Sequence, residues 1–415
     1  MYRKSYGRST SGTRPPSRFG RSSSGSGPRS DRSRSYGNSR GGRRVSRAKY
    51  IDPSKFINKI TITEEVERFI PTHKFQDFNI DPRIKDIISK KGYLLPTPIQ
   101  DMAIPHILNG LDVVGIANTG TGKTAAFLLP LINAALQNPN NQTLIIAPTR
   151  ELAVQINAEL KGFTTGLKIF SATCYGGAPI GGQIRELRYH NDFVIGTPGR
   201  LKDLINKNVL NLSKFNAIVL DEADRMLDMG FVNDMRFIVN LMPKKRQGLF
   251  FSATMSLEIE KLIGEFLTDP VKISVKTRDT AKNVEQDIVR IEAGKNKIDV
   301  LHELLNKPEF NKVIIFGRTK HGVDKLSRLL TERGFKVESI HGNKNQSRRQ
   351  KALDLFKKNH VQALIATDVA ARGIDIVDVS HVINFDIPET YDDYVHRIGR
   401  TGRGDKKGKA LTFIE

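Results

Sequence analysis

The stretch Val113-Val-Gly-Ile-Ala-Asn-Thr-Gly-Thr-Gly-Lys-Thr124 decides how the rest of the chain is interpreted. The apolar run from Val113 to Ile116 predicts a buried strand, and a helical pattern from Thr124 to Leu136 follows the Gly-rich turn. This order is typical of a phosphate-binding loop, in which backbone N–H groups surround an anion and the helix N-terminus adds partial positive charge. The stretch therefore predicts a nucleotide site.

The loop assigns separate tasks to its side chains. Lys123 would neutralise the outer phosphates, and Thr124 would offer its hydroxyl to Mg²⁺. Ala117 stands where the usual pattern begins with glycine. The residues expected to bind the nucleotide here are Ala117, Thr119, Gly120, Thr121, Gly122, Lys123 and Thr124. A Gly-rich turn before an ordinary helix is the alternative, and the loop alone does not name the reaction.

Length and composition limit the class of protein. A chain of 415 residues has room for two or three domains with cores of their own. The lone Cys174 excludes a disulfide framework and a cysteine-based zinc site, which favours a reducing, cytoplasmic compartment. Because no apolar run is long enough to span a bilayer and no secretory signal opens the sequence, we expect a soluble protein without a membrane partner.

The charge is concentrated at the start of the chain. Residues 1–49 contain 14 Lys and Arg against Asp31 alone and so carry +13, which leaves +9 of the total +22 for the rest. This segment is rich in Arg, Ser and Gly and predicts disorder, because it cannot bury enough apolar surface to offset its ordering entropy. It could tether RNA, act only as a solubilising tail, or be an organelle transit peptide, although its Gly and Pro disfavour the last.

After an extension of ordinary composition, with a strand-like Ile60–Glu64, short apolar runs alternate with helical patterns. A short helix, Pro82 to Lys90, and the turn Gly92–Gln100 precede the phosphate loop. Later strands are expected at Thr143–Ala147, Lys168–Cys174, Asp192–Gly196, Ala217–Asp221 and Gly248–Ser252, and helices at Arg150–Phe163, Ile180–Tyr189, Arg200–Asn206 and Leu257–Phe266. Such alternation predicts a parallel sheet covered by helices, with ligands at the carboxyl ends of the strands.

A polar stretch around Lys272–Asn283 predicts a linker to a second domain of the same class. Its strands are expected at Gln286–Ile291, Lys312–Phe316, Lys336–Ile340, Ala363–Thr367, His381–Phe385 and Lys409–Ile414, and its helices at Lys320–Arg333, Ser347–Lys358 and Tyr391–Ile398. The expected division is a disordered segment 1–49, an extension 50–74, a first domain 75–275, a linker 276–285 and a second domain 286–415. Because the second domain has no phosphate loop, it should act across a cleft or bind another ligand.

Two further stretches carry chemistry. The strand ending at Asp221 delivers two adjacent carboxylates, of which Asp221 would hold Mg²⁺ and Glu222 would orient and deprotonate the attacking water. In the second domain, His396-Arg-Ile-Gly-Arg-Thr-Gly-Arg403 offers positive charge for a phosphate, with Arg400 and Arg403 one turn apart if the helix continues. An acidic loop that solvates a strand end and a solvated basic patch are the alternatives.

Together these stretches resemble a DEAD-box RNA helicase of the second helicase superfamily, because Asp221-Glu-Ala-Asp224 accompanies a full set of ordered motifs from Phe75 onward. The resemblance implies two tandem RecA-like domains that use ATP and Mg²⁺ and bind RNA. It implies that Gln100 reads adenine, that Phe75 packs on the base, that Asp375 binds the ribose and that Arg400 and Arg403 contact phosphate. Alanine at position 117 is common in this family.

The same resemblance implies coupling and RNA-binding residues. Ser252-Ala-Thr254 would bond to Asp224 and link hydrolysis to strand separation, with His396 in a related coupling role. The implied RNA contacts are Pro148, Thr149, Arg150, Gly176, Gly177, Thr197, Pro198, Gly199, Arg200, Arg318, Thr319, Gln346, Arg349 and Thr367. Hydroxyls, helix starts and single arginines suit sugar–phosphate contacts, and the scarcity of aromatics predicts weak base readout. Gly317-Arg318 departs from the family's usual small or polar pair.

The sequence is thus interpreted as an RNA-dependent ATPase that locally separates short RNA duplexes or remodels RNA–protein complexes. A non-catalytic RNA clamp and a DNA-directed helicase of the same superfamily are the alternatives. We expect no RNA-recognition domain after Glu415, so specificity for particular RNAs is expected to come from the leading segment or from protein partners.

Overall fold

The computed structural model describes residues 52–57, 69–118, 120–275, 284–292, 294–371, 376, 378–402 and 408–414. Several sequence expectations lie outside these residues: the disorder of 1–49, the strand Ile60–Glu64, and the positions of Thr119, Asp375 and Arg403. Within the described part of the chain, no helix has the length and apolar character needed to cross a membrane. A short 3-10 turn, η1 (Pro53–Phe56), precedes the first helix.

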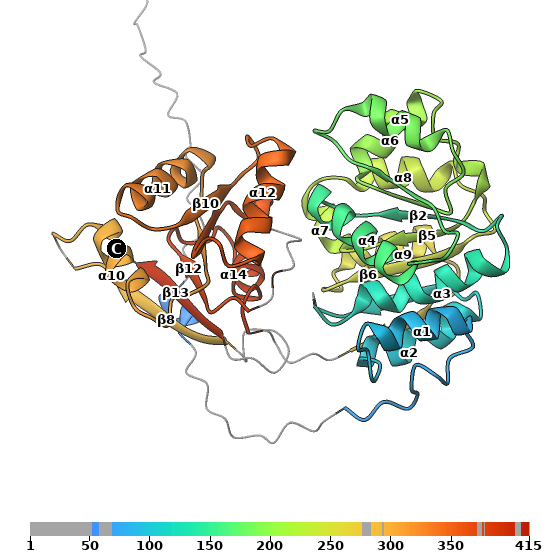
Figure 1. Cartoon of the computed structure of the whole chain (residues 1–415), viewed down its shortest axis with the longest axis horizontal. Helices are drawn as coiled ribbons and strands as arrows, with labels where there is room; N and C mark the ends of the chain where they lie inside the picture. The colour runs from blue at the N-terminus through green and yellow to red at the C-terminus, as the bar shows by residue number, and fades with distance from the viewer. Residues whose placement is uncertain are drawn as a thin grey trace, which may run out of the picture. The chain divides into compact units, whose positions relative to one another are not determined.

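The first domain is built on a parallel sheet in the strand order β3-β4-β2-β5-β6-β1-β7 (Figure 1). Its strands are β1 (Val113–Ile116), β2 (Gln142–Ile146), β3 (Ser171–Cys174), β4 (Phe193–Gly196), β5 (Phe215–Leu220), β6 (Gln247–Ser252) and β7 (Val271–Ser274). Its helices are α1 (Pro82–Lys90), α2 (Pro98–Leu108), α3 (Lys123–Gln137), α4 (Arg150–Phe163), α5 (Ile180–Leu187), α6 (Pro198–Asn206), α7 (Ala223–Asp228), α8 (Val232–Asn240) and α9 (Leu257–Phe266), with a 3-10 turn η2 (Leu212–Lys214).

The second domain repeats this plan in the order β10-β11-β9-β12-β13-β8. Its strands are β8 (Val284–Arg290), β9 (Val313–Phe316), β10 (Val337–Ile340), β11 (Ala363–Ala366), β12 (His381–Asn384) and β13 (Gly408–Ile414). Its helices are α10 (Lys297–Leu305), α11 (Lys320–Glu332), α12 (Gln346–Lys357), α13 (Asp368–Ala371) and α14 (Tyr391–Ile398). All the strand pairs described in both sheets are parallel, which confirms the predicted α/β class.

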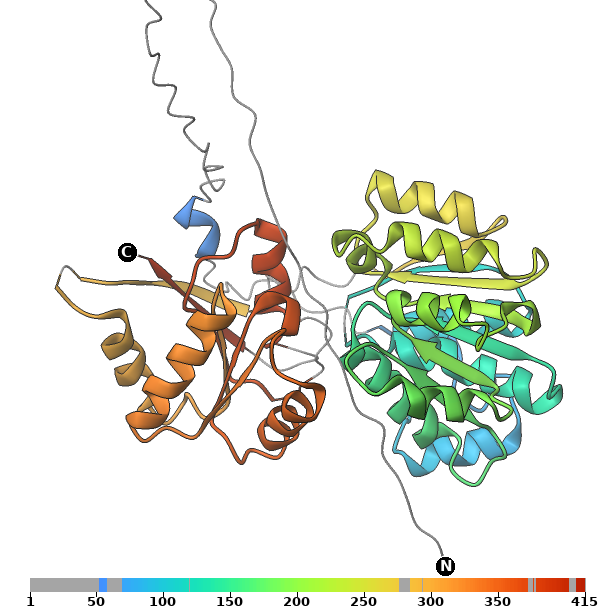
Figure 2. The same cartoon turned by 90° about the horizontal axis from the view of Figure 1, so that it is seen from above.

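Helices cover both faces of each sheet (Figures 1 and 2). In the first domain, neighbours along β2 alternate between two cores: Ile145 packs with Phe127 and Ile156, whereas Leu144 packs with Val194 and other residues of the opposite face. A strand that is buried on both faces reads as a continuous apolar run. This is why the strand positions were predictable from composition.

The segment after Gly92 was predicted only as a turn to Gln100, and here the prediction was too short. Helix α2 begins at Pro98 and continues to Leu108, although Pro105 lies inside it. Pro98 has the backbone angle of a first helical residue, and the Gln100 side chain accepts a hydrogen bond from the Thr97 N–H at 3.0 Å. The interior proline hid the helical pattern.

The linker prediction was also partly wrong. Val271–Ser274 forms β7, which pairs with β1 from Val113 to Ile116, so the first sheet extends into the stretch assigned to the linker. Strand β8 begins at Val284, inside the predicted linker 276–285, and pairs with β13. We propose that the connection between the domains lies within residues 275–283.

A buried histidine makes the stability of the second domain sensitive to pH. The His381 ring is 4% exposed and stacks on Phe310 with centroids 3.8 Å apart. Burial, aided by Lys409, lowers the pKa of His381 from 6.5 to about 4. Below pH 6.5 the unfolded chain binds a proton at this histidine, whereas the native domain binds it only near pH 4. The contribution of His381 to the free energy of unfolding is therefore fully present above pH 6.5 and is lost as the pH falls towards 4.

We expect the wild-type second domain to lose about 2 kcal/mol from this group between pH 7 and pH 5, and His381→Leu to lack that part of the loss. Urea unfolding at the two pH values measures the difference. His360→Leu, at an exposed histidine of the same domain, is the matched control. An equal acid sensitivity in His381→Leu and wild type would contradict the prediction.

Candidate nucleotide and RNA sites

The phosphate loop follows β1 and ends at the uncapped start of α3. Gly120 and Gly122 have φ values of 85° and 92°, which glycine adopts without strain. Gly122 occupies the N-cap position of the 15-residue helix α3. Glycine has no side chain that could accept a hydrogen bond from the first N–H groups of the helix. A helix start of this kind favours a bound anion.

Lys123 is the most direct indication of an anion-binding site. Its side chain is 6% exposed, and within the described residues no acceptor bonds its Nζ. A buried ammonium without a hydrogen-bond partner is costly, and a phosphate oxygen would satisfy it. Lys123 lines a cavity of about 220 Å³ together with Gly122, Thr124, Asp221 and Glu222.

Asp221 and Glu222 lie at the end of β5, facing the same cavity as Lys123. Asp221 is 3% exposed and accepts a hydrogen bond from the Glu222 N–H at 3.0 Å. Burial raises the pKa of Asp221 to about 6, against the opposing effect of Lys123. A nearby divalent cation would lower this pKa again, because it favours the charged carboxylate.

Glu222 is held in an unusual backbone conformation by its surroundings. Its φ of 51° lies in the left-handed region, where a side chain of this type is rare. Its Oε2 accepts a hydrogen bond from the Arg225 guanidinium at 2.6 Å, and both side chains are buried. Burial acts to raise the pKa of Glu222, but Arg225 and Lys123 outweigh it and lower the pKa. Glu222 is therefore kept ionised beside the cavity, and Arg225 was not foreseen from the sequence.

The third carboxylate of this stretch, Asp224, joins β5 to its neighbour β6. Its Oδ2 accepts hydrogen bonds from the Ala253 and Thr254 N–H groups, both at 3.0 Å, and from the Thr254 hydroxyl at 3.2 Å. Ser252 donates its hydroxyl to the Thr254 carbonyl at 2.8 Å. The expected contact between residues 252–254 and Asp224 is present, and it ties together the carboxyl ends of two adjacent strands.

The residues expected to read adenine lie next to the phosphate loop or behind a second aromatic ring. Gln100 is 1% exposed and donates its Nε2 to the Gly122 carbonyl at 3.1 Å, so it fastens the preceding turn to the phosphate loop. Phe75 is 3% exposed and packs edge-on against Phe78 and Tyr93. Tyr93 is 37% exposed and lines the cavity, whereas Phe75 does not. The ring that faces the cavity is thus Tyr93, supported from behind by Phe75.

Ala117 is explained by its packing. It is 2% exposed and belongs to the core beneath the loop, and its N–H donates to the Ser252 carbonyl at 3.0 Å. The Cα of Gly115, by contrast, lies so near Phe251 that an added Cβ would come within 2.6 Å of that ring. Glycine is therefore required at 115, and a methyl group is accommodated at 117.

The implied RNA contacts of the first domain lie at the same edge of the sheet as the nucleotide cavity, but on the other side of β5 from the phosphate loop. They follow β2, β3 and β4, which are neighbours in the sheet. Thr149 caps α4 by accepting from the Leu152 N–H, and Pro198 is the first residue of α6. The Arg150 guanidinium lies against Gly177, where a Cβ would collide with it. These helix starts and this arginine suit backbone phosphates.

Arg200 is held by the loop after β3. It donates to the Gln183 Oε1 at 2.8 Å and to the Ala178 carbonyl at 3.3 Å. Gln183 in turn donates to the Tyr175 carbonyl at 3.0 Å, which fixes the path of this loop next to Gly176 and Gly177. Gln183 is a supporting residue that no sequence pattern indicated.

In the second domain the implied contacts again follow neighbouring strands, β9, β10 and β11. Thr319 caps α11 by accepting from the Gly322 N–H at 3.0 Å, and the Arg318 N–H donates to Asp386 at 2.7 Å. Thr367 follows β11 directly. Gln346 and Arg349 lie in the first turn of α12, which Asn345 caps by accepting from the Arg348 N–H at 3.0 Å.

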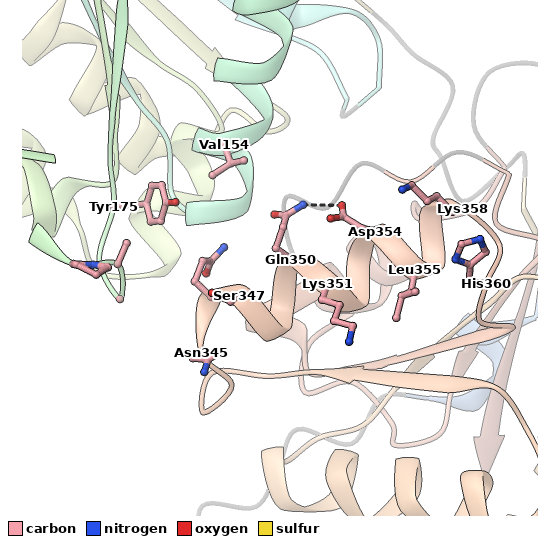
Figure 3. A pocket seen from close by; sticks show the side chains of 14 residues that line it. Val154, Tyr175, Asn345, Ser347, Gln350, Lys351, Asp354, Leu355, Lys358 and His360 are labelled. Carbon is pink, nitrogen blue, oxygen red and sulfur yellow. Dashed lines mark hydrogen bonds between the residues drawn. The ribbon is translucent and has the colours of Figure 1, made fainter. Parts of the chain in front are cut away.

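Figure 3 shows α12 from the side, with Asn345 at its start and a hydrogen bond from Gln350 to Asp354 of 2.9 Å along it. This bond joins residues one turn apart on the helix surface and stabilises α12 by a few tenths of a kcal/mol. Gln346 lies at the start of this helix.

The arginine-rich stretch contains a structural arginine that the sequence did not distinguish. Arg397 is 2% exposed and binds Asp368 through two hydrogen bonds of 2.6 and 2.8 Å. It also donates to Asn384 at 3.2 Å and to the Asp386 carbonyl at 2.7 Å. Arg397 therefore ties α14 to the ends of β11 and β12.

The condition for placing Arg400 and Arg403 one helical turn apart, a helix that continues, is not met at Arg400, and Arg403 lies outside the described residues. Helix α14 ends at Ile398, and the Gly399 N–H closes it by donating to the Val395 carbonyl at 3.0 Å. Arg400 lies in the following turn and donates its Nε to the His396 carbonyl at 3.2 Å.

Two known sequence families match this chain. Residues 97–262 match the family described as "DEAD/DEAH box helicase", and residues 296–405 match "Helicase conserved C-terminal domain". The "DEAD-box ATP-dependent RNA helicase CshA" of Bacillus subtilis (strain 168) is 45% identical over 345 residues, which cover 83% of this chain and 70% of the relative. The chain belongs to the DEAD-box family of ATP-dependent RNA helicases.

Further comparisons agree. The "ATP-dependent RNA helicase CshA" of Listeria monocytogenes is 46% identical over 82% of this chain and 66% of the relative, so this helicase spans about two thirds of the length of its curated relatives. The structure "S. cerevisiae Dbp5 bound to RNA and ADP BeF3" matches with a TM-score of 0.73 at 29% identity, covering 82% of this chain and 89% of that one. "DEAD-box helicase Mss116 bound to ssRNA and UDP-BeF" matches with a TM-score of 0.75, also at 29% identity, covering 83% of this chain and 76% of that one. The two tandem RecA-like domains are thereby confirmed.

The residues of this helicase fit an ATP–Mg²⁺ complex. The buried, unbonded Lys123 Nζ and the open start of α3 suit a polyphosphate. Within the described residues, no group of three or more His, Cys, Asp or Glu side chains could hold a metal by itself. Mg²⁺ in phosphate loops takes one or two protein oxygens and completes its shell with phosphate and water, so Thr124 and Asp221 would be enough to hold it.

Proposed function

We propose that this helicase uses ATP to separate short RNA duplexes locally, and that ATP and RNA act on opposite halves of one sheet edge. The observation that carries the proposal is the set of bonds from Ala253 and Thr254 to Asp224. They connect the segment containing Asp221 and Glu222 to the end of β6. Because β5 also pairs with β2, which begins the RNA half of this edge, a change in the nucleotide at the cavity would be transmitted from β5 to β2.

The nucleotide half has a role for each residue. We propose that Lys123 and the backbone of Gly120 to Thr124 bind the phosphates, and that Thr124 and Asp221 hold Mg²⁺. Bound Mg²⁺ would supply positive charge to the phosphate oxygens. Glu222, which Arg225 and Lys123 keep ionised, would orient the attacking water and accept its proton. Tyr93 would pack on the base, with Gln100 holding the turn in place and retaining a second amide hydrogen for the adenine.

The second domain is proposed to complete the site. Arg400, together with Arg403 and Asp375 outside the described residues, would contact phosphate and ribose when RNA brings the domains together, and His396 would couple that closure to RNA. The RNA would lie along its sugar–phosphate backbone on the contacts that follow β2 to β4 and β9 to β11. Bending of one strand on closure would separate its partner. We place this activity in the cytoplasm.

The proposal is tested by steady-state ATP hydrolysis measured without nucleic acid, with single-stranded RNA and with single-stranded DNA. Stimulation by RNA alone is the expected result, because the second domain contributes its arginines only in the RNA-bound state. Hydrolysis that DNA stimulates equally would favour the DNA-directed alternative. No hydrolysis in any condition would favour a non-catalytic clamp.

Deleting residues 1–49 should weaken RNA binding and flatten its salt dependence. This segment carries +13, and each phosphate neutralised on a single strand contributes about −0.7 to the slope of log K against log salt. We expect the slope to become shallower by at least 2 while kcat at saturating RNA stays within twofold. Fluorescence anisotropy from 50 to 200 mM KCl measures the slope, and an unchanged slope would leave the segment as a solubilising tail.

A further inference from the structure

The extension before the first domain contains a short turn that is built to present one aromatic ring. Asp52 accepts a hydrogen bond from the Ser54 N–H at 2.9 Å, and Pro53 supplies the backbone angle for the start of η1. The Ile57 N–H closes the turn by donating to the Ser54 carbonyl at 3.3 Å. The turn is therefore specified locally, before any packing is considered.

The ring that this turn presents is buried in the second domain. Phe56 is 1% exposed, whereas Asp52, Ser54 and Ile57 are exposed. Phe56 shares a core cluster with Val284 of β8 and with Tyr394 and Ile398 of α14. Its ring meets Tyr394 edge-on, with centroids 4.7 Å apart and planes at 62°. Figures 1 and 2 both draw the blue turn beside β8.

The partner ring belongs to a buried polar network. The Tyr394 hydroxyl donates to the Gln286 Oε1 of β8 at 2.8 Å, so α14 and β8 are bonded directly under Phe56. One turn further along α14 stands Arg397, with its bonds to Asp368 and Asn384. Phe56 thus covers the helix from which the turn containing Arg400 continues. Removing the ring would expose the Tyr394–Gln286 bond to water.

The same extension is next bonded to the first domain. The Thr72 and His73 N–H groups donate to the Asp101 carboxylate of α2 at 2.8 and 3.1 Å, and Phe75 enters the first core. Phe56 and Thr72 are 16 positions apart in the sequence, and a chain of that length spans at most roughly 55 Å. The extension is therefore anchored in both domains, in addition to the connection within 275–283.

We propose that residues 52–57 are a docking element that fastens the N-terminal extension to the second domain through Phe56. The docked element supports α14 and limits how far the two domains separate when ATP and RNA are absent. The docking itself does not depend on the proposed duplex separation.

Three variants of the full chain test the proposal. Phe56→Ala removes the anchor. Ile57→Ala changes the neighbouring residue, which is 43% exposed, and is the matched control. The third variant inserts a 20-residue Gly-Ser segment after Ile57, which keeps the anchor and lengthens the tether. Amide hydrogen exchange in α14 should be at least tenfold faster in Phe56→Ala and unchanged in the other two.

The second measurement is the distance between labels placed in the two domains. Thr165→Cys and Lys307→Cys are exposed positions for the labels, and Cys174 is fully buried, with a thiol pKa raised to about 12 by burial, so it should not react. In the absence of ATP and RNA, the distance distribution should extend to longer values in Phe56→Ala and in the Gly-Ser variant, but not in Ile57→Ala.

Either measurement can overturn the proposal. Unchanged exchange in α14 of Phe56→Ala would show that the turn is not docked. An unchanged distance distribution in both Phe56→Ala and the Gly-Ser variant would show that the docked turn does not restrain the domains. RNA-stimulated hydrolysis of wild type, measured in parallel, reports on the proposed function separately.

Discussion

Replacing Glu222 by Gln is expected to lower kcat for RNA-stimulated ATP hydrolysis by about 1,000-fold, with ATP and RNA affinities within threefold of wild type. A positioned general base contributes roughly 10²–10⁴ in rate, and the amide cannot accept the proton of the attacking water. Its shape is preserved, so the cavity lined by Lys123 and Asp221 should still bind nucleotide. Single-turnover hydrolysis and equilibrium binding of a labelled ATP analogue measure the two effects.

The control for this variant is Glu258→Gln, at an exposed position in the first turn of α9. It removes the same charge from the same domain and should leave kcat unchanged. Because the neutral amide in Glu222→Gln would no longer balance the charge of the buried Arg225, thermal unfolding should be measured alongside, to separate lost chemistry from lost folding. Hydrolysis by Glu222→Gln within tenfold of wild type would show that another group accepts the proton.

Replacing Arg397 by Met is expected to destabilise the second domain by about 3–5 kcal/mol. The long apolar side chain fills part of the volume, but it leaves Asp368, Asn384 and the Asp386 carbonyl without their donor. Removing one partner of a buried ion pair costs more than the pair itself contributes, because the remaining charge is left uncompensated. Urea unfolding, with hydrogen exchange to assign each transition to its domain, measures the loss.

Arg348→Met is the matched control, because Arg348 is an exposed arginine on α12 of the same domain. The double variant Arg397→Met with Asp368→Asn should recover part of the lost stability, since the unpaired carboxylate is then absent. A change below 1 kcal/mol in Arg397→Met would show that water replaces the arginine without cost. Arg397 would then not have the structural role that its bonds to Asp368 and Asn384 indicate.

The positions of most strands and helices could be predicted, because buried parallel strands form short apolar runs and the helices between them keep their periodicity. The errors occur where local signals conflict. Pro105 disguised α2, and the polar residues of β7 resembled a linker. In β7, long-range pairing with β1 outweighed the average character of the segment.

The residues of the candidate site also fall into those that could be predicted from the sequence and those that could not. Lys123, Asp221 and Glu222 could be chosen from the sequence, since each follows a strand within a short motif. Tyr93 could not be separated from Phe75, because which ring faces the cavity depends on how the turn packs against Phe163. The pairing of Arg225 with Glu222 depends on the left-handed backbone at residue 222, which no spacing rule predicts.

The sequence by itself determined that this is a two-domain α/β protein with a nucleotide loop after β1 and a carboxylate pair after β5. These features are local, and a strand followed by a Gly-rich turn or by two acids has few structural solutions. Only the tertiary structure decided which residues meet: Asp224 with Thr254, Arg397 with Asp368, and Phe56 with Tyr394, a pair separated by more than 330 positions in the chain. Such contacts depend on strand order and core packing, which bring together residues whose separation in the sequence carries no signal.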